Sequence, residues 1–389
     1  MTLFDEQTNG YSGPTKLGES SFAFLNRSVQ PKEQAVRERL ELWFLRYPAA
    51  NQNSLRARLR SEVDQEHDAA FFELLLHELL LRLGCRVEVE APIPDKRTKP
   101  DFLVEDPSGL KWYLEAVTVS AMPSLVTGAQ RMMASLCDWL NDRLPRRDYL
   151  LLVFYTGSPS GSPPKKPMLK FLRDKLGSCD YPTVLGASRS RGYQALPCWV
   201  YPWGACRVQF QLIPRKESAR EDASVPVLCH PNLAREASLE QMVNRIRDAI
   251  MEKARKYGRL KKPFVVALNV PNWHVDSVQF MLALFGWDDL AHGFSEGPEL
   301  VKLGMPRPKG VWLQGTSAKG ACYTRLSAVV CCSYLTPWNL GESDLRLYNN
   351  PWAAHPYESV LNRLPLCVTH KDGRSERSGG LSLAGILAD

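Results

Sequence analysis

Residues 100–104 read Pro-Asp-Phe-Leu-Val, and residues 111–119 read Lys-Trp-Tyr-Leu-Glu-Ala-Val-Thr-Val. Both segments are apolar enough to form buried strands, yet each contains a carboxylate, Asp101 in the first and Glu115 in the second. Burying a carboxylate costs a large desolvation free energy unless the group is paired or bound to a cation. These two acids are therefore the strongest functional signal in the chain.

The turn sequence Asp-Pro-Ser-Gly at 106–109 favours a hairpin between the two segments. A hairpin that pairs residue 105 with residue 111 places Asp101 opposite Glu115, with both side chains on one face of the sheet. Like charges at opposed positions destabilise a sheet unless something neutralises them. Since Mg²⁺ prefers carboxylate oxygens, the hairpin predicts a site for Mg²⁺ or Mn²⁺ at these two acids.

A third acid lies on the helix that we expect over residues 66–83, which ends at Gly84. At 100° per residue, Glu73 shares a helix face with small and apolar side chains such as Ala70. Glu73 is therefore predicted to point toward the sheet and to join Asp101 at the metal. Alternatively, Glu73 pairs with His77 one turn later, or with a nearby arginine, for structural reasons.

The hydrophobic periodicity along the chain predicts an α/β fold, with a central mixed β-sheet flanked by helices. We expect helices over 32–46, 51–65, 66–83, 126–143, 239–257 and 276–285. We expect strands over 85–90, 101–105, 111–119, 149–155, 206–213, 263–270, 309–314 and 322–334. The near-continuous apolar run at 149–155 favours a strand that is covered on both faces.

The same pattern predicts the domain organisation. Residues 1–30 are predicted to be a flexible arm with little regular structure, and residues 31–65 a helical N-terminal segment. Residues 66–272 are predicted to form the core, with an insertion at about 156–205 that begins in a Pro- and Gly-rich loop. Residues 273–389 are predicted to be a C-terminal α/β extension packed on the core.

The composition bounds the class of protein. The 389 residues carry a formal net charge of +7, which permits nucleic acid as a partner without requiring it. The ten cysteines form no CxxC pair, and no apolar stretch is long enough to span a bilayer. We therefore expect a cytoplasmic protein with reduced thiols and no membrane partner. Walker-type and dinucleotide-binding glycine motifs do not occur, and the histidines show no metal-ligand spacing.

The order of these elements carries a resemblance. A helix with Glu73, a strand, Pro100-Asp101 and then Glu115 in the next strand resembles the PD-(D/E)xK nuclease superfamily, which has a restriction-endonuclease-like fold. Residues 253–257 and the strand after them also resemble the second helix–strand unit of an uncharacterised bacterial group of this kind. The resemblance covers about 66–270.

The resemblance implies a core of the order α-β-β-β-α-β and a metal-dependent nuclease acting on DNA, in bacterial defence or DNA repair. It implies that Mg²⁺ is held by Asp101, Glu115 and the main-chain carbonyl of Ala116, with Glu73 completing the shell or ordering a second metal or a water. The basic helix over 239–262 would contact phosphates, or would simply be a solvated helix. The sequence leaves the oligomeric state open, with a homodimer as one option.

One position departs from the family pattern, because Val117 stands where the motif has a catalytic lysine. Lys256 is our candidate replacement, and Lys253, Lys99 and Gln130 are alternatives that the sequence does not separate. Such a residue would orient the attacking water or stabilise charge in the transition state. Two alternatives stay open. The chain could be an inactive nuclease-fold module that binds nucleic acid or a protein partner, with the missing lysine as a sign of lost chemistry, or an unrelated α/β protein whose acids are paired for structural reasons.

Overall fold

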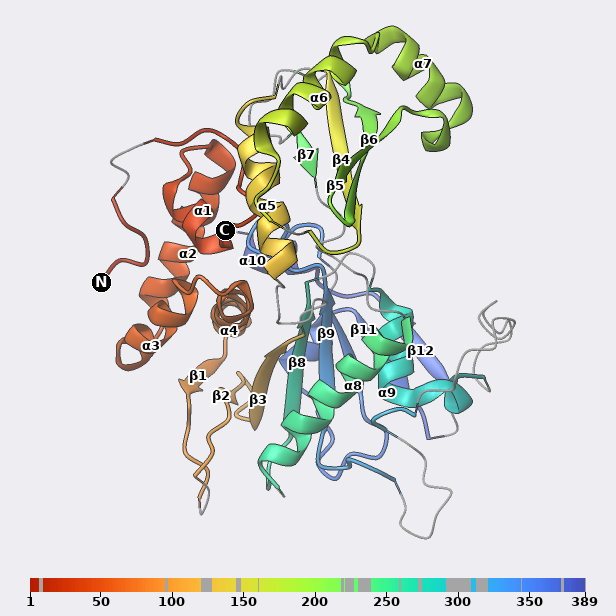
Figure 1. The fold of residues 1–389 in the computed structure, drawn as a ribbon. Helices are drawn as coiled ribbons and strands as arrows, with labels where there is room; N and C mark the ends of the chain where they lie inside the picture. The colour runs from red at the N-terminus through yellow and green to blue at the C-terminus, as the bar shows by residue number, and fades with distance from the viewer. Residues whose placement is uncertain are drawn as a thin grey trace. The chain divides into compact units, whose positions relative to one another are not determined.

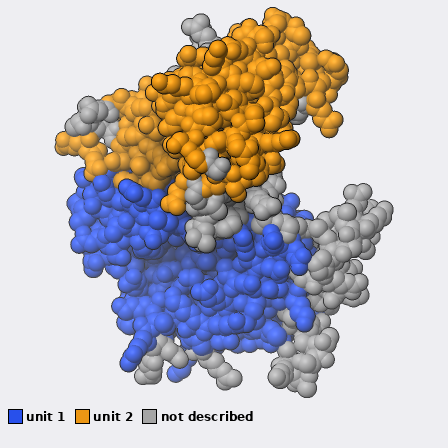
Figure 2. Space-filling view, in the orientation of Figure 1, with its two compact units in different colours: residues 1–4, 35–121, 236–389 blue, residues 5–34, 122–235 orange. Residues whose placement is uncertain are grey.

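The structure is a computed structural model, and it describes the chain with the exception of residues 7–9, 95–96, 120–127, 145–147, 160, 218–219, 221–226, 230–238, 259, 272–274, 292–308, 313–320, 344, 372–373 and 389. At positions 128, 130, 193, 239 and 287–291 only the backbone is described. The chain forms two compact units, which Figure 2 distinguishes by colour. Unit 1 comprises Met1–Phe4, Ala35–Ala121 and Glu236–Asp389, and unit 2 comprises Asp5–Gln34 and Met122–Arg235.

Unit 1 is built on an eight-stranded mixed sheet in the order β1-β2-β3-β8-β9-β10-β11-β12 (Figure 1). Pairing is parallel between β3 and β8, β8 and β9, and β10 and β11, and antiparallel between the other neighbours. The strands are β1 (Arg86–Val89), β2 (Phe102–Glu105), β3 (Lys111–Thr118), β8 (Phe264–Val270), β9 (Ala328–Ser333), β10 (Leu345–Asn349), β11 (Leu366–Thr369) and β12 (Ser375–Ser378).

Helices cover both faces of this sheet. Strand β8 reads Phe-Val-Val-Ala-Leu-Asn-Val with every residue buried, as expected for a parallel strand covered on both sides. Helices α8 (Leu239–Lys256) and α9 (Ser277–Ala291) pack on the face that carries Tyr113. Helix α4 (Asp64–Arg82) lies on the opposite face, where the His77 ring contacts Phe102. The predicted α/β fold with a helix-flanked mixed sheet is therefore confirmed. The other helical segments of unit 1 are α3 (Ala49–Leu59), η5 (Val360–Arg363), α10 (Leu383–Leu387) and, from Ala35 onward, α2 (Pro31–Arg46), whose first turn belongs to unit 2.

Unit 2 contains a separate four-stranded sheet in the order β5-β6-β4-β7. Its elements are α1 (Ser21–Arg27), α5 (Gly128–Asn141), β4 (Tyr149–Thr156), α6 (Lys165–Gly177), α7 (Tyr181–Arg191), η1 (Tyr193–Ala195), β5 (Cys198–Trp203), β6 (Cys206–Pro214) and β7 (Leu228–Cys229). Helices α5, α6 and α7 pack on the sheet face that carries Val153, Phe210 and Leu212. Unit 2 thus has a hydrophobic core of its own.

The domain boundaries differ from those predicted. The predicted insertion at 156–205 is narrower than the second segment of unit 2, which runs from 122 to 235. The apolar strand at 149–155 is β4, which belongs to unit 2 and alternates between buried and half-buried residues rather than being covered on both faces. Leu152 and Phe154 are apolar but only half-buried, so the sequence of β4 is continuously apolar although the burial of its residues alternates.

Three further expectations are corrected. The segment after 273 is not an extension packed on the core, because β9 pairs directly with β8 and β10 to β12 continue the central sheet from β9. The predicted arm over 1–30 contains helix α1, which begins where the Ser20 hydroxyl accepts a hydrogen bond from the Ala23 N–H. The described part of the strand predicted at 309–314, residues 309–312, is not in a strand, and 313–314 lie outside the described residues.

Among the described residues, no helix combines the length and apolar character needed to cross a bilayer.

Candidate functional site

The hairpin between β2 and β3 has the predicted register. Glu105 pairs with Lys111, and Phe102 pairs with Leu114, so Asp101 lies beside Glu115 at the end of β2. Two hydrogen bonds join the acids to the strand backbone. The Asp101 N–H donates to Glu115 Oε2 over 3.2 Å, and the Ala116 N–H donates to Asp101 Oδ2 over 2.7 Å. The turn and the alternation of β3 therefore bring both carboxylates together, as expected.

Helix α8 supplies two lysines to the buried carboxylate of Glu115. Lys253 Nζ and Lys256 Nζ lie 2.8 Å and 2.9 Å from the same oxygen, Glu115 Oε1. Because the two lysines are three residues apart on a helix, they share one face and reach β3 together. The carboxylate itself is fully buried, while 23% of the Lys253 side chain and 38% of the Lys256 side chain stay exposed. The predicted Lys256 thus reaches the acids, and Lys253 does so too.

Tyr257 completes the surroundings of Glu115. Its hydroxyl contacts Glu115 Oε2 and lies 2.9 Å from the main-chain oxygen of Lys99, so its single proton serves one of them at a time. Burial and the negative charge of Glu115 raise the pKa of Tyr257, which keeps the hydroxyl protonated as a donor. Tyr257 therefore fixes the orientation of Glu115.

Asp101 is the electrostatically strained member of the site. Burial, the neighbouring Glu115 and then Glu73 raise the pKa of Asp101 to about 7, against the opposing effects of the Ala116 N–H and Lys253. Its second oxygen, Oδ1, makes no hydrogen bond to any described residue. Burial opposes the charge on Lys253, but Glu115 and Asp101 outweigh it and raise the pKa of this lysine.

Glu73 is close enough to affect Asp101, but its own oxygens are already occupied. Arg58 on α3 donates to Glu73 Oε2 over 2.6 Å and to Oε1 over 3.0 Å, and the Tyr47 hydroxyl donates to Oε1 over 2.6 Å. The predicted role of Glu73 as a metal ligand does not fit this geometry. Of the two alternatives, the structure shows the arginine partner rather than His77, whose Nδ1 is buried with no hydrogen-bond partner among the described residues.

Replacing Arg58 with alanine is expected to lower the free energy of unfolding by about 2–4 kcal/mol, because it leaves the buried Glu73 carboxylate without its cation. Urea titration followed by tryptophan fluorescence measures the change. Arg56→Ala on the same helix is the matched control, since Arg56 is half-buried and, among the described residues, donates to the main-chain oxygen of Thr2 and pairs with no acid. An equal loss in both variants would contradict the assigned role of Arg58.

Among the described residues, neither the side chain of the candidate Lys99 nor that of the nearby Lys111 contacts the carboxylates of Asp101 and Glu115. Lys111 forms an ion pair of 3.2 Å with Glu105, and Lys99 joins the site only through its main-chain oxygen. The side chain of Gln130 lies outside the described residues.

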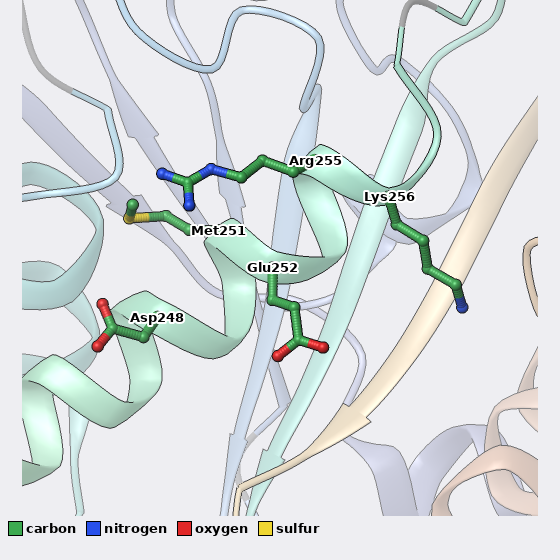
Figure 3. A pocket seen from close by; sticks show the side chains of 5 residues that line it. All are labelled: Asp248, Met251, Glu252, Arg255 and Lys256. Atoms are coloured by element: carbon green, nitrogen blue, oxygen red, sulfur yellow. The ribbon is translucent and has the colours of Figure 1, made fainter.

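A surface hollow of about 410 Å³ lies beside the site on α8, lined by Asp248, Met251, Glu252, Arg255 and Lys256. In Figure 3 the Lys256 side chain extends from the helix toward strand β3, whereas the Arg255 side chain points away from that strand. All five lining residues come from one helix and they carry both signs of charge. The hollow is therefore a depression beside the carboxylates and does not contain them.

Scans against models of protein families, curated proteins and solved structures each found no match to this chain.

The fit of a metal ion can be judged from the donors present. Within the described part of the chain, no group of three or more His, Cys, Asp and Glu side chains is placed to hold a metal. Asp101 and Glu115 nevertheless form a pair of adjacent carboxylates, one of which has an uncommitted oxygen and a pKa that is raised by negative neighbours. Mg²⁺ commonly binds through one or two carboxylates and keeps several waters. Asp101 Oδ1 is therefore the oxygen that fits Mg²⁺ directly. Both oxygens of Glu115 already accept hydrogen bonds, so Glu115 would join the ion only by giving up a lysine contact, and Glu73 would have to give up its arginine.

Sequence reasoning missed three residues of the site, Tyr47, Arg58 and Tyr257. Tyr257 could have been found from the local sequence, because it comes soon after Lys253 and directly after Lys256, at the end of the helix that meets the sheet. Arg58 and Tyr47 meet Glu73 through the packing of α2 and α3 on α4, for which the sequence offers no periodic signal.

Proposed function

We propose that this protein is a metal-dependent nuclease that hydrolyses phosphodiester bonds, with DNA as its substrate. The observation that carries the proposal is the half-buried Asp101 beside the fully buried Glu115, which two lysines of α8 contact. Two carboxylates with neighbouring ammonium groups provide the ligands for a hard cation and the positive charge that a phosphate needs.

The order of elements in unit 1 supports the same proposal. Helix α4, strands β1, β2 and β3, helix α8 and strand β8 follow one another, with the second segment of unit 2, Met122–Arg235, inserted between β3 and α8. This is the α-β-β-β-α-β order that the PD-(D/E)xK resemblance implies. We propose a restriction-endonuclease-like core on this basis. Since a shared fold does not imply a shared function, the nuclease activity is inferred from the carboxylates and lysines of the site.

Asp101 and Glu115 would hold Mg²⁺ or Mn²⁺ together with the main-chain oxygen of Ala116. The Ala116 N–H already points to the β2 side, and its carbonyl shares that side because both groups of a strand residue face one neighbour. When bound, the ion would polarise the scissile phosphate and lower the pKa of a bound water.

The protein side chains have separate roles in this proposal. Lys253 and Lys256 each donate one N–H to Glu115, and their other four N–H groups would bind non-bridging phosphate oxygens and stabilise charge in the transition state. They stand in for the lysine that Val117 replaces. Tyr257 holds the Glu115 carboxylate in place, and Glu73 contributes a fixed negative charge near Asp101.

The direct test is incubation of plasmid DNA with the wild-type protein and Asp101→Ala in Mg²⁺, in Mn²⁺ and in EDTA. Cleavage by the wild type that needs the metal and is lost in Asp101→Ala is the expected result. Failure of the wild type to cut plasmid or single-stranded DNA with either metal would overturn the proposal.

Removing one lysine of the α8 pair is expected to reduce cleavage by about 10-fold, and removing both by about 10³-fold, because each lysine can partly replace the other. Lys253→Met, Lys256→Met and the double variant are compared by initial rates of plasmid nicking. Lys261→Met, which changes an exposed lysine just after the helix, is the matched control. Full activity in the double variant would show that the lysines serve only to neutralise Glu115.

A second candidate function has one observation in its favour. Arg58, Lys253 and Lys256 already match the three carboxylates Glu73, Asp101 and Glu115 in number, so the site is balanced without a metal. Such balance is what an inactive nuclease-fold module that binds nucleic acid would need. Isothermal calorimetry with Mn²⁺ separates the two functions. A nuclease must bind the metal, and Asp101→Ala must abolish that binding. The inactive module needs no metal, so no binding is expected.

A further inference from the structure

The net positive charge of the chain is confined to one of its two units. Unit 2 contains 19 Lys and Arg against 12 Asp and Glu, whereas unit 1 contains 30 of each kind. The whole formal excess of +7 therefore belongs to unit 2, although the proposed chemistry belongs to unit 1. A concentration of like charge in one folded unit is the electrostatic footprint of a polyanion-binding surface.

The basic residues of α8 cannot supply this footprint, because most of them have partners inside unit 1. Lys253 and Lys256 contact Glu115, and Arg247 pairs with Asp248 at 2.9 Å. The Arg255 guanidinium lies 5.5 Å from the centre of the Tyr323 ring. Phosphate contacts from this helix are therefore limited to the proposed role of Lys253 and Lys256 at the scissile phosphate, and the rest of the DNA backbone needs cations from elsewhere.

Helix α6 of unit 2 carries exposed cations that are not paired with acids among the described residues. Its inner face buries Met168, Leu172 and Leu176 in the core of the unit. Its outer face carries the exposed residues Lys166, Lys170 and Arg173 at positions i, i+4 and i+7, which lie in one row along the helix. None of these three forms an ion pair with an acid among the described residues. Asp174 is the acid on the same helix, one position beyond the row.

The row continues onto the neighbouring helix α5. Arg173 donates to the main-chain oxygen of Arg143 over 3.0 Å, and the Arg143 guanidinium lies 4.3 Å from the centre of the half-buried Trp139 ring. Lys165 Nζ approaches the same ring at 5.9 Å. Asp142 offers Arg143 only a long contact of 4.0 Å. Cations interleaved with accessible aromatic rings are typical of surfaces that bind nucleic acid.

We infer that Trp139, Arg143, Lys165, Lys166, Lys170 and Arg173, here called the α6 row, form the nucleic-acid-binding surface of this protein. The α6 row contacts the sugar–phosphate backbone and therefore binds DNA without regard to its base sequence. The inference deepens the proposed function and rests on it for the choice of nucleic acid as the polyanion. In this proposal unit 2 provides the binding affinity for DNA and unit 1 carries out the phosphodiester hydrolysis.

The test measures binding separately from cleavage, by fluorescence anisotropy of a short labelled DNA duplex and its single strand in EDTA. The full-length wild type is compared with Lys166→Glu/Lys170→Glu/Arg173→Glu. The matched control is Lys309→Glu/Arg363→Glu/Lys371→Glu, which makes the same charge change at three exposed positions of unit 1. Circular dichroism establishes that both variants are folded.

The α6 variant is expected to bind at least about tenfold more weakly, and its log–log salt slope is expected to shrink by about 2 to 3, one unit per lost phosphate contact. The control is expected to stay close to the wild type. Equal losses in both variants, or no loss in the α6 variant, would overturn the inference. So would α6-dependent binding to phosphatidylserine vesicles in the absence of DNA binding. Binding that depends on the α6 row in a protein that cuts no DNA would instead sustain this inference while the nuclease proposal fails.

Discussion

Replacing Glu115 with glutamine is expected to abolish DNA cleavage and also to lower the free energy of unfolding by about 3 kcal/mol. The carboxylate is fully buried, and its charge balances Lys253 and Lys256 while Tyr257 and the Asp101 N–H bind its second oxygen. Removing one partner of a buried charge network leaves the other charges uncompensated. The loss of cleavage follows from the loss of a proposed metal ligand and is expected to reach at least about 10³-fold.

Urea denaturation and plasmid nicking measure the two effects of Glu115→Gln in parallel. Glu105→Gln is the matched control, because the half-buried Glu105 lies in the same hairpin and pairs with the exposed Lys111. A surface pair of this kind contributes about 1 kcal/mol or less. A Glu115→Gln protein as stable as Glu105→Gln would show that the lysines do not depend on this carboxylate.

Replacing Asp101 with asparagine is expected to abolish cleavage to the same extent but to stabilise the protein at neutral and alkaline pH. The folded protein raises the pKa of Asp101 to about 7, so ionised Asp101 is less favourable in the folded chain than in the unfolded chain. The unfolded carboxyl ionises near its ordinary value of about 4. The penalty is therefore absent below that pH, grows as the pH rises to about 7, and is constant above it.

The stabilisation by Asp101→Asn is thus expected to increase between pH 4 and pH 7 and to reach about 1–3 kcal/mol above pH 7. Urea titrations of the variant and the wild type at a series of pH values in EDTA measure it. For the wild type, the rate of cleavage is expected to rise through the same interval as Asp101 loses its proton. A stability difference with no pH dependence, or one that favours the wild type at pH 8, would contradict the role of Asp101.

Local sequence signals were sufficient for the part of the site that lies within one hairpin. The turn at 106–109 and the two-residue period of β3 determined that Asp101 would lie beside Glu115, and the structure confirms that register. The sequence identified Lys253 and Lys256 as candidates for the missing lysine but could not decide between the candidates. Helix α8 lies far along the chain from β3, and the approach of its lysines to Glu115 depends on how the helix packs.

The predictions were wrong where the sequence showed what kind of segment a residue lies in but not which distant residue or strand it contacts. Glu73 was predicted to face the sheet, but the cation that it meets comes from α3, and nothing in the spacing of Arg58 indicates that contact. Strand β4 is apolar enough for the central sheet, and only its pairing with β6 assigns it to unit 2. Pairing between distant strands is a tertiary property, which single-sequence periodicity does not report.

The placement of unit 2 between β3 and α8 has a consequence for biosynthesis. Glu115 leaves the ribosome long before Lys253, 138 residues further along the chain, and β3 emerges with one edge unpaired until β8 has been made. Because domains fold as units while the chain is still being translated, unit 2 can finish folding during this delay. The nascent N-terminal half must meanwhile carry an open hydrophobic strand edge, which is a hazard for aggregation. Slower translation or a shortage of chaperones should therefore reduce the yield of folded protein more than the stability of the finished molecule would suggest.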